Sequence, residues 1–151
     1  MKKTCFMFGH SNAEDHIYES IVRAVKMHYE RCGVRRFVIG HYGNFDKIGR
    51  HALAEVKKEY PDIENLLLTP YFPFEKEIQL PEGMDGTLIP EGIENAPKRL
   101  RIIRANCAML KAADTIICHV NHFSNTRDLL EKAEKSKNIE HITNVESIPH
   151  P

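Results

Sequence analysis

The hydrophobic positions along the chain fall into two alternating patterns. Short, nearly continuous apolar runs, of which residues 3–8 are the clearest, are typical of strands covered on both faces of a parallel sheet. Between these runs, apolar residues recur at intervals of three and four, which predicts helices that bury one side. The predicted strands span residues 3–8, 35–39, 63–69, 87–89, 114–120 and 139–143.

Capping residues indicate where the helices begin and end. Residues 11–14 have the composition of a capping box, and Gly33 suits the end of the helix that follows. Asn44 is the expected N-cap of a second helix, which Pro61 ends. Further helices are predicted at residues 98–112 and 126–137.

The predicted helix at residues 98–112 carries two patterns. Its expected apolar stripe consists of Leu100, Ile103, Cys107 and Leu110. Lys98, Arg101 and Arg104 recur at intervals of three, which is typical of a solvated face. A subunit contact with the acidic segment that holds Glu91 and Glu94 is the alternative for these cations.

The alternation of strand and helix patterns predicts an α/β fold. We expect a doubly wound, mostly parallel, Rossmann-like sheet with helices on both faces. A chain of 151 residues suits one domain that spans residues 1–151. In such a sheet the carboxyl ends of the parallel strands lie at one edge, where open α/β folds bind their ligands.

The composition restricts the classes of partner. Lys plus Arg (21) equals Asp plus Glu (21), whereas nonspecific nucleic-acid binding usually needs a basic face. No apolar run is long enough to span a bilayer, and the first residues lack the apolar stretch of a signal peptide. We therefore expect a cytoplasmic protein without a membrane or nucleic-acid partner. The four cysteines form no Cys-x-x-Cys motif and are expected to be reduced and mostly buried.

Glycine and histidine follow the ends of the predicted strands. Gly9-His10 follows the first strand, Gly40-His41 follows the second, and His122 comes just after the fifth. We expect these residues to line a crevice, because glycine permits close approach and histidine adds a polar, protonatable tip. A zinc site made of such histidines lacks an acidic partner in the sequence, so we expect neither a metal nor another cofactor.

Residue types that suit contact with a phosphate or a ribose lie beside these dipeptides. Ser11 follows His10, and Gly43 and Asn44 complete a glycine-rich turn whose amides are expected to face an anion. The next candidates open the last long helix: Ser124, Asn125 and Thr126. The same residue types also favour any helix start, so a capping role alone stays open for them. No arrangement of nucleophile and base is visible from spacing.

Several short motifs together resemble one known group of proteins. They are Gly9-His10 after the first strand, residues 40–46 (GHYGNFD), Tyr71 with Pro73, residues 90–94 (PEGIE), residues 97–99 (PKR), Asn106 and His122. In this order they resemble small bacterial proteins of the SLOG superfamily, a Rossmann-like group. The resemblance covers nearly the whole chain. It implies a homo-oligomer that binds a nucleotide or nucleotide-derived small molecule in the strand-end crevice, as a sensor or accessory protein.

The chain departs from the family pattern in ways that keep two alternatives open. Ser11 and Ala105 stand where the pattern has arginines, and Asn125-Thr126 replaces its paired glycines. One alternative is a hydrolase that cleaves the N-glycosidic bond of a nucleoside monophosphate, with Glu91 as the candidate catalytic carboxylate. The other is a structural oligomer with a degenerate pocket, since glycines that admit a phosphate are missing.

Overall fold

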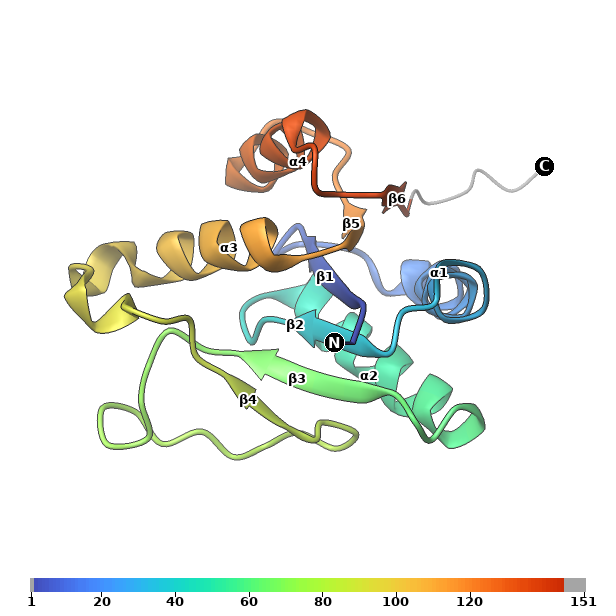
Figure 1. Ribbon diagram of the computed structural model, residues 1–151, viewed down its shortest axis with the longest axis horizontal. Helices are drawn as coiled ribbons and strands as arrows, with labels where there is room; N and C mark the ends of the chain where they lie inside the picture. Colours follow the sequence, from blue (N-terminus) through green and yellow to red (C-terminus); the bar gives the residue numbers. More distant parts are fainter. Residues whose placement is uncertain (1, 146–151) are drawn as a thin grey trace.

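The computed structural model describes residues 2–145 and contains one six-stranded sheet (Figure 1). Its strands are β1 (Thr4–Gly9), β2 (Arg36–Ile39), β3 (Glu64–Leu68), β4 (Gly86–Leu88), β5 (Thr115–His119) and β6 (His141–Asn144). They lie in the order β4-β3-β2-β1-β5-β6, and each neighbouring pair is parallel. The predicted doubly wound, Rossmann-like α/β fold is confirmed, with every strand parallel.

Four α-helices cover the two faces of the sheet. They are α1 (Tyr18–Cys32), α2 (Asn44–Glu59), α3 (Arg101–Ala112) and α4 (Asn125–Lys135). Short 3-10 turns occur at η1 (Asp15–Ile17), η2 (Ile93–Asn95) and η3 (Lys98–Leu100). Buried residues of α1 and α2 share one hydrophobic cluster, and those of α3 and α4 share the other. The crossovers therefore place two helices on each side, as Figure 1 shows.

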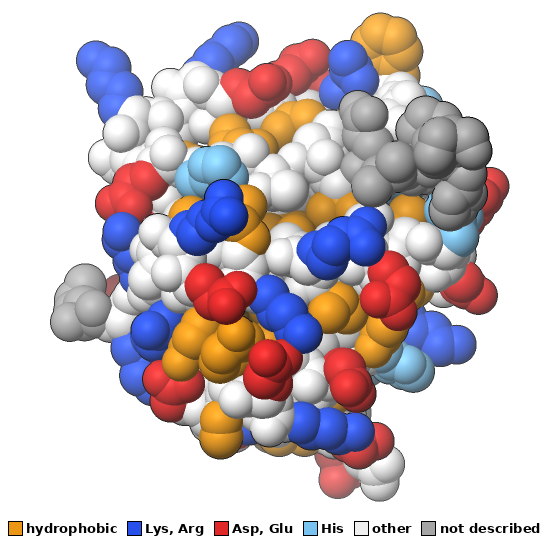
Figure 2. Space-filling view, turned by 90° about the vertical axis from the view of Figure 1, so that its right-hand side faces the viewer, with side chains coloured by type: hydrophobic (Ala, Val, Ile, Leu, Met, Phe, Trp, Pro, Cys, Tyr) orange, Lys and Arg blue, Asp and Glu red, His pale blue; other side chains and the backbone are white. Residues whose placement is uncertain are grey.

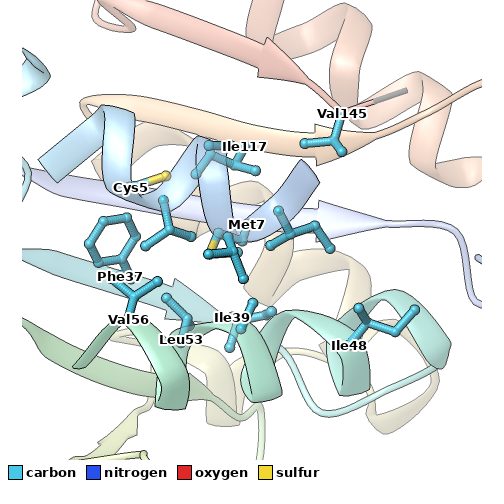
Figure 3. Packing of buried hydrophobic residues seen from close by; sticks show 14 of the residues in the cluster. Cys5, Met7, Phe37, Ile39, Ile48, Leu53, Val56, Ile117 and Val145 are labelled. Atoms are coloured by element: carbon cyan, nitrogen blue, oxygen red, sulfur yellow. The ribbon is translucent and has the colours of Figure 1, made fainter. Parts of the chain in front are cut away.

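Strand β1 is apolar at nearly every position because both of its faces are buried. Cys5 and Met7 belong to the cluster under α1 and α2, whereas Phe6 and Phe8 belong to the cluster under α3 and α4. Successive side chains of a strand point to opposite faces, so a central strand buries both sets. Figure 3 shows the first cluster, in which Cys5 and Met7 of β1 meet residues of β2, α2 and β5.

Two predicted helix starts are wrong. Residues 11–14 form no capping box: α1 begins only at Tyr18, after η1, and Glu14 makes no capping hydrogen bond through its side chain. The N-cap of α2 is Gly43, with φ 91°, instead of Asn44. The Asn44 side chain instead donates to the carbonyl of Ala13. Both predictions fail because residues 10–14 and 43–45 pack against each other, a contact that a local pattern does not contain. Gly33 does end α1, at φ 74°.

The orientation of α3 also differs from its predicted apolar stripe. Of the predicted stripe, Leu110 is buried but Ile103 is 52% exposed, and Ala105 and Met109, outside the stripe, are buried. Arg101, predicted to lie on a solvated face, is buried and forms a 2.6 Å ion pair with Glu75. That prediction is wrong because the turn that holds Glu75 packs over the start of α3.

Charges of both signs are interspersed over the face drawn in Figure 2, which is the right-hand side of Figure 1. The strands β2 and β3 begin on this side of the molecule. Ion pairs of the described residues include Arg36 with Glu64 at 2.6 Å and Lys26 with Glu59 at 2.7 Å. Mixed signs on this surface agree with the zero net charge of the sequence.

The cysteines are free thiols in the described part of the chain. Cys5 and Cys118 are buried, and burial raises the pKa of each thiol to about 12. Cys32 and Cys107 are only partly buried. Between residues 2 and 145, no helix has the length and apolar character that a membrane crossing requires.

Candidate functional site

The turns after β1, β2 and β5 meet at the carboxyl edge of the sheet, as predicted. The His10 amide donates to the carbonyl of His119 at 3.3 Å, which joins the first turn to the end of β5. The Asn44 amide donates to the carbonyl of Ser11 at 2.8 Å, which joins it to the turn after β2. The strand order places β1 between β2 and β5, so its turn is the centre of this edge. This is the switch point where open α/β sheets bind ligands.

A cleft of about 640 Å³ opens at this edge, between the strand ends and helices α3 and α4. Of the residues predicted to bind a ligand, eight line it: Gly9, His10, Ser11, Gly40, His122, Ser124, Asn125 and Thr126. His41, Gly43 and Asn44 do not line it. The predicted residues at the end of β1 and the start of α4 therefore line the cleft, whereas only Gly40 of the predicted residues in the turn after β2 does so.

Gly43 and Asn44 brace the turn after β1. A Cβ at Gly43 would come within 2.6 Å of the Ser11 Cα, so only glycine fits this close approach. Within residues 40–44, the Tyr42 amide donates to Asp46 Oδ2 at 3.0 Å, and the Asn44 amide donates to Ser11. Amides expected to face an anion are thus occupied by acceptors of the protein itself. His41 packs edge-on against Tyr42, with ring centroids 6.2 Å apart.

His10 is the most enclosed polar side chain of the cleft lining. It is 3% exposed and stacks on His122, with the ring centroids 3.6 Å apart. Its Nε2 accepts a hydrogen bond from the Asn121 amide at 2.9 Å. Burial lowers the pKa of His10 to about 4, and the neighbouring His122 and His119 add to the shift. His10 is therefore neutral at pH 7.

The bond from Asn121 also determines which ring nitrogen of His10 carries the proton. Because Nε2 accepts, the neutral ring is protonated at Nδ1, which lies 3.3 Å from Ser124 Oγ. His10 thus donates to Ser124 and cannot withdraw its proton. A serine nucleophile needs an adjacent base that takes its proton, and His10 does not serve as that base for Ser124. The arrangement holds the two turns together and presents their polar groups to the cleft.

Asp46 brings a carboxyl group into the same cleft. It lies in the first turn of α2, is 8% exposed, and lines the cleft together with Gly40 and Tyr42. Burial raises the pKa of this carboxyl to about 7, although the Tyr42 amide and Arg50 act in the opposite direction. A carboxyl that titrates near neutrality inside a cleft is a strong indicator of function. From the sequence, Asp46 resembled an ordinary acidic residue in a first helical turn.

The start of α4 supplies hydrogen-bond donors at the other end of the cleft. Ser124 is the N-cap, and its carbonyl and hydroxyl both accept from the Arg127 amide. The amides of Asn125 and Thr126 precede the first intrahelical bond. In the described part of the chain they donate to no protein acceptor. Both residues line the cleft, so these donors are free for a ligand.

Apolar side chains form the part of the cleft near β3. Leu68 and Pro70 come from the end of that strand, and Ile102 and Ile103 of α3 line the same cleft. The two isoleucines are 38% and 52% exposed, which is high for large apolar residues. Sequence reasoning missed this wall, because it assigned Ile103 to the buried stripe of its helix.

Glu91 lies elsewhere. It lines a second cleft of about 720 Å³, between the later half of α3 and the start of β1 and β2. The two clefts share no lining residue. Asn12 and Asn106 line the first cleft and were not among the predicted site residues. Between residues 2 and 145, no three His, Cys, Asp or Glu side chains are placed to hold a metal ion.

The fold and the cleft define the class of protein: an α/β domain with a Rossmann-like, all-parallel sheet and a polar cleft at its switch point. No protein-family model matches the chain, and a comparison with curated proteins finds no significant match.

Proposed function

We propose that the cleft binds a nucleoside or nucleoside monophosphate, as part of a sensor or accessory protein. The observation that carries this proposal is the order of chemistry along the cleft. From β3 towards α4, its lining changes from apolar to a carboxyl, and then to free backbone amides. A nucleoside monophosphate has the same order of base, sugar and phosphate.

The apolar end suits a base. Leu68, Pro70 and Ile102 all line the cleft, and apolar side chains of this kind suit contact with a ring. The middle, at Gly9 and Gly40, lacks side chains that would fill it. At Gly9 a Cβ would overlap the buried ring of Phe45, so the packing of α2 on β1 keeps this strand end as glycine.

The end of the cleft at α4, where the amides of Asn125 and Thr126 lie, suits one phosphate. Free amides in the first turn of a helix bind anions, helped by the positive end of the helix dipole. The charged residues that line the cleft are Asp46, Asp128 and Lys132. Two carboxyl groups against one lysine disfavour a polyphosphate, so a ligand with a small negative charge fits best. The volume of about 640 Å³ lies within the range of small-molecule sites, roughly 300–1,000 Å³.

The geometry supports binding over the two alternatives. Hydrolysis of the N-glycosidic bond by Glu91 would need that carboxylate in the same cleft as the sugar, and Glu91 lines the second cleft. A degenerate pocket would be filled by its own side chains, whereas this cleft stays open. The proposed SLOG-like ancestry is compatible with a nucleotide in this crevice.

Calorimetric titration with AMP, GMP, CMP and UMP tests the proposal. We expect at least one monophosphate to bind, and the matching triphosphate to bind more weakly. Asn106→Trp, which places a large ring in the cleft, should weaken binding at least about tenfold. The matched control is Ala108→Trp, two residues along α3 at the second cleft, which should keep the wild-type affinity. Absence of binding by all nucleosides and monophosphates at millimolar concentration would refute the proposal.

A further inference from the structure

Asp46 has hydrogen-bonding capacity that the protein does not use. Its Oδ2 accepts from the Tyr42 amide at 3.0 Å, and within the described residues Oδ1 has no such partner. A carboxylate offers about four acceptor positions on two oxygens. Since the side chain lines the cleft, its spare acceptors are presented to whatever the cleft holds.

The structural role of this carboxyl group is the hydrogen bond from the Tyr42 amide, which uses only Oδ2. Asp46 is not the cap of α2, because Gly43 holds that position. Among the described residues it forms no ion pair: the nearby Arg50 donates to the carbonyl of Gly40 at 3.3 Å instead. Burying a carboxyl group that lacks a charged partner destabilises a fold. A residue that weakens the fold and faces a cleft is best explained by its ligand.

The position of Asp46 indicates which part of the ligand it meets. Asp46 Oδ2 lies against the bare backbone of Gly40, where a Cβ would be 2.7 Å away. This point is at the end of β2, between the apolar wall at β3 and the free amides of α4. In the proposed order of base, sugar and phosphate, it is the place of the sugar.

We propose that Asp46 is the specificity-determining residue of the cleft and accepts hydrogen bonds from the 2′ and 3′ hydroxyls of a ribose. This inference rests on the proposed binding of a nucleotide. Two adjacent hydroxyls match two adjacent acceptors, whereas a phosphate at this point would be repelled by the carboxylate. The ligand class is therefore a ribonucleoside or its 5′-monophosphate. The 2′-deoxy and 2′-phosphorylated forms are excluded.

The titration of Asp46 agrees with this role. Burial raises the pKa of its carboxyl to about 7, so at neutral pH the protonated and the anionic forms are about equally populated. Hydroxyl donors stabilise the anionic form and replace the water that burial removes. The titratable and charged groups that influence Asp46 are Arg50 on α2 itself and, through its amide, Tyr42 of the preceding turn.

The test compares the binding of each 5′-monophosphate with that of its 2′-deoxy and 2′-phosphate forms, by calorimetry on the full chain. Wild-type protein should bind the ribonucleotide at least about tenfold more tightly, as expected for loss of a hydrogen bond to a charged group. Asp46→Asn keeps the oxygen that accepts from Tyr42 but presents an NH2 donor to the cleft. It should therefore bind the ribo and deoxy forms equally.

Asp128→Asn is the matched control, because it neutralises the other carboxyl of the cleft at the α4 end. It should keep the ribose preference while changing affinity for the phosphate. A wild-type protein that binds both sugars equally, or an Asp46→Asn variant that retains the preference, overturns this inference and leaves nucleotide binding standing. Failure of every nucleotide to bind overturns both. Equal binding of both sugars by the wild type overturns the inference even if the variant does not fold.

Discussion

His28 in α1 and Asp46 in α2 are both buried ionisable side chains, but their partners differ. His28 Nδ1 lies 3.0 Å from Thr115 Oγ1, and its Nε2 lies 2.9 Å from Thr143 Oγ1. Both ring nitrogens are therefore satisfied by the protein, in a bridge from α1 to β5 and β6. Asp46 has one hydrogen bond and a cleft in place of a second partner. A buried polar group satisfied on all sides holds structure, whereas a partly satisfied one beside a cavity points to a ligand.

The largest effect is expected from removal of the fully satisfied group. His28→Ala leaves a cavity and two threonine hydroxyls without their partner, so we expect the free energy of unfolding to fall by about 3 kcal/mol. Urea denaturation measures this change. His141→Ala is the control, since His141 is exposed: its ring meets the edge of the His28 ring, and its Nε2 lies 3.2 Å from Thr143 Oγ1. Its cost should stay within about 0.5 kcal/mol. A similar fall in unfolding free energy in both variants would show that the hydrogen bonds of His28 do not stabilise the fold more than the exposed His141 does.

Acid should weaken the bridge at His28. Burial lowers the pKa of His28 to about 4, from a usual value near 6.5. Between these values the unfolded chain binds a proton that the folded chain does not, so the stability that His28 contributes falls as the pH decreases. Down to pH 4.5 this loss amounts to about 2 kcal/mol. The gap in unfolding free energy between wild type and His28→Ala should narrow by that amount. A gap independent of pH would contradict the assigned shift.

Asp46 should behave in the opposite way. Its pKa is raised to about 7, so between pH 4 and 7 the folded chain retains a proton that the unfolded chain has lost. Its contribution to stability therefore falls as the pH rises through that window. We expect Asp46→Asn to stabilise the protein by about 4 kcal/mol at pH 8, with the gain vanishing near pH 4. Thermal unfolding at both pH values measures it. Destabilisation at pH 8 would show that the carboxyl serves the fold.

The smallest effect concerns the cap at the donor end of the cleft. Ser124→Ala removes the hydroxyl that accepts from Arg127 and contacts His10, so the unfolding free energy should fall by about 1 kcal/mol. Ser136, at the opposite end of α4, provides the control for loss of a serine hydroxyl. If Ser136→Ala lowers the unfolding free energy by the same amount, the cap at Ser124 has no special role in the cleft.

The sequence predicted the sheet better than the helix ends. Strand β1 is apolar at nearly every position, because both of its faces are buried, and this pattern is visible in the local sequence. The helix starts at residues 11–14 and Asn44 were wrong because the two turns satisfy each other. Arg101 was placed on the surface because periodicity cannot show that Glu75, 26 residues earlier, packs over its helix.

The candidate site was predictable only in part: the residues at the strand ends were identified from the sequence, and Asp46 was not. Residues that directly follow a strand, such as Gly9, His10 and Gly40, were found because parallel strands end at one edge. Asp46 was missed, since an acidic residue in a first helical turn is usually explained by the helix dipole. Its direction into the cleft depends on how α2 packs against β1, through the contact of Phe45 with Gly9.

By itself, the sequence determined the order of strands and helices, the burial of the central strands, and the gathering of glycine and histidine at one edge. These properties follow from spacing along the chain, which local sterics and hydrophobic burial convert directly into structure. Only the tertiary structure decided which amides are already occupied and which carboxyl faces the cleft. Hydrogen bonds between distant turns use up donors and acceptors, and no local pattern records which groups remain.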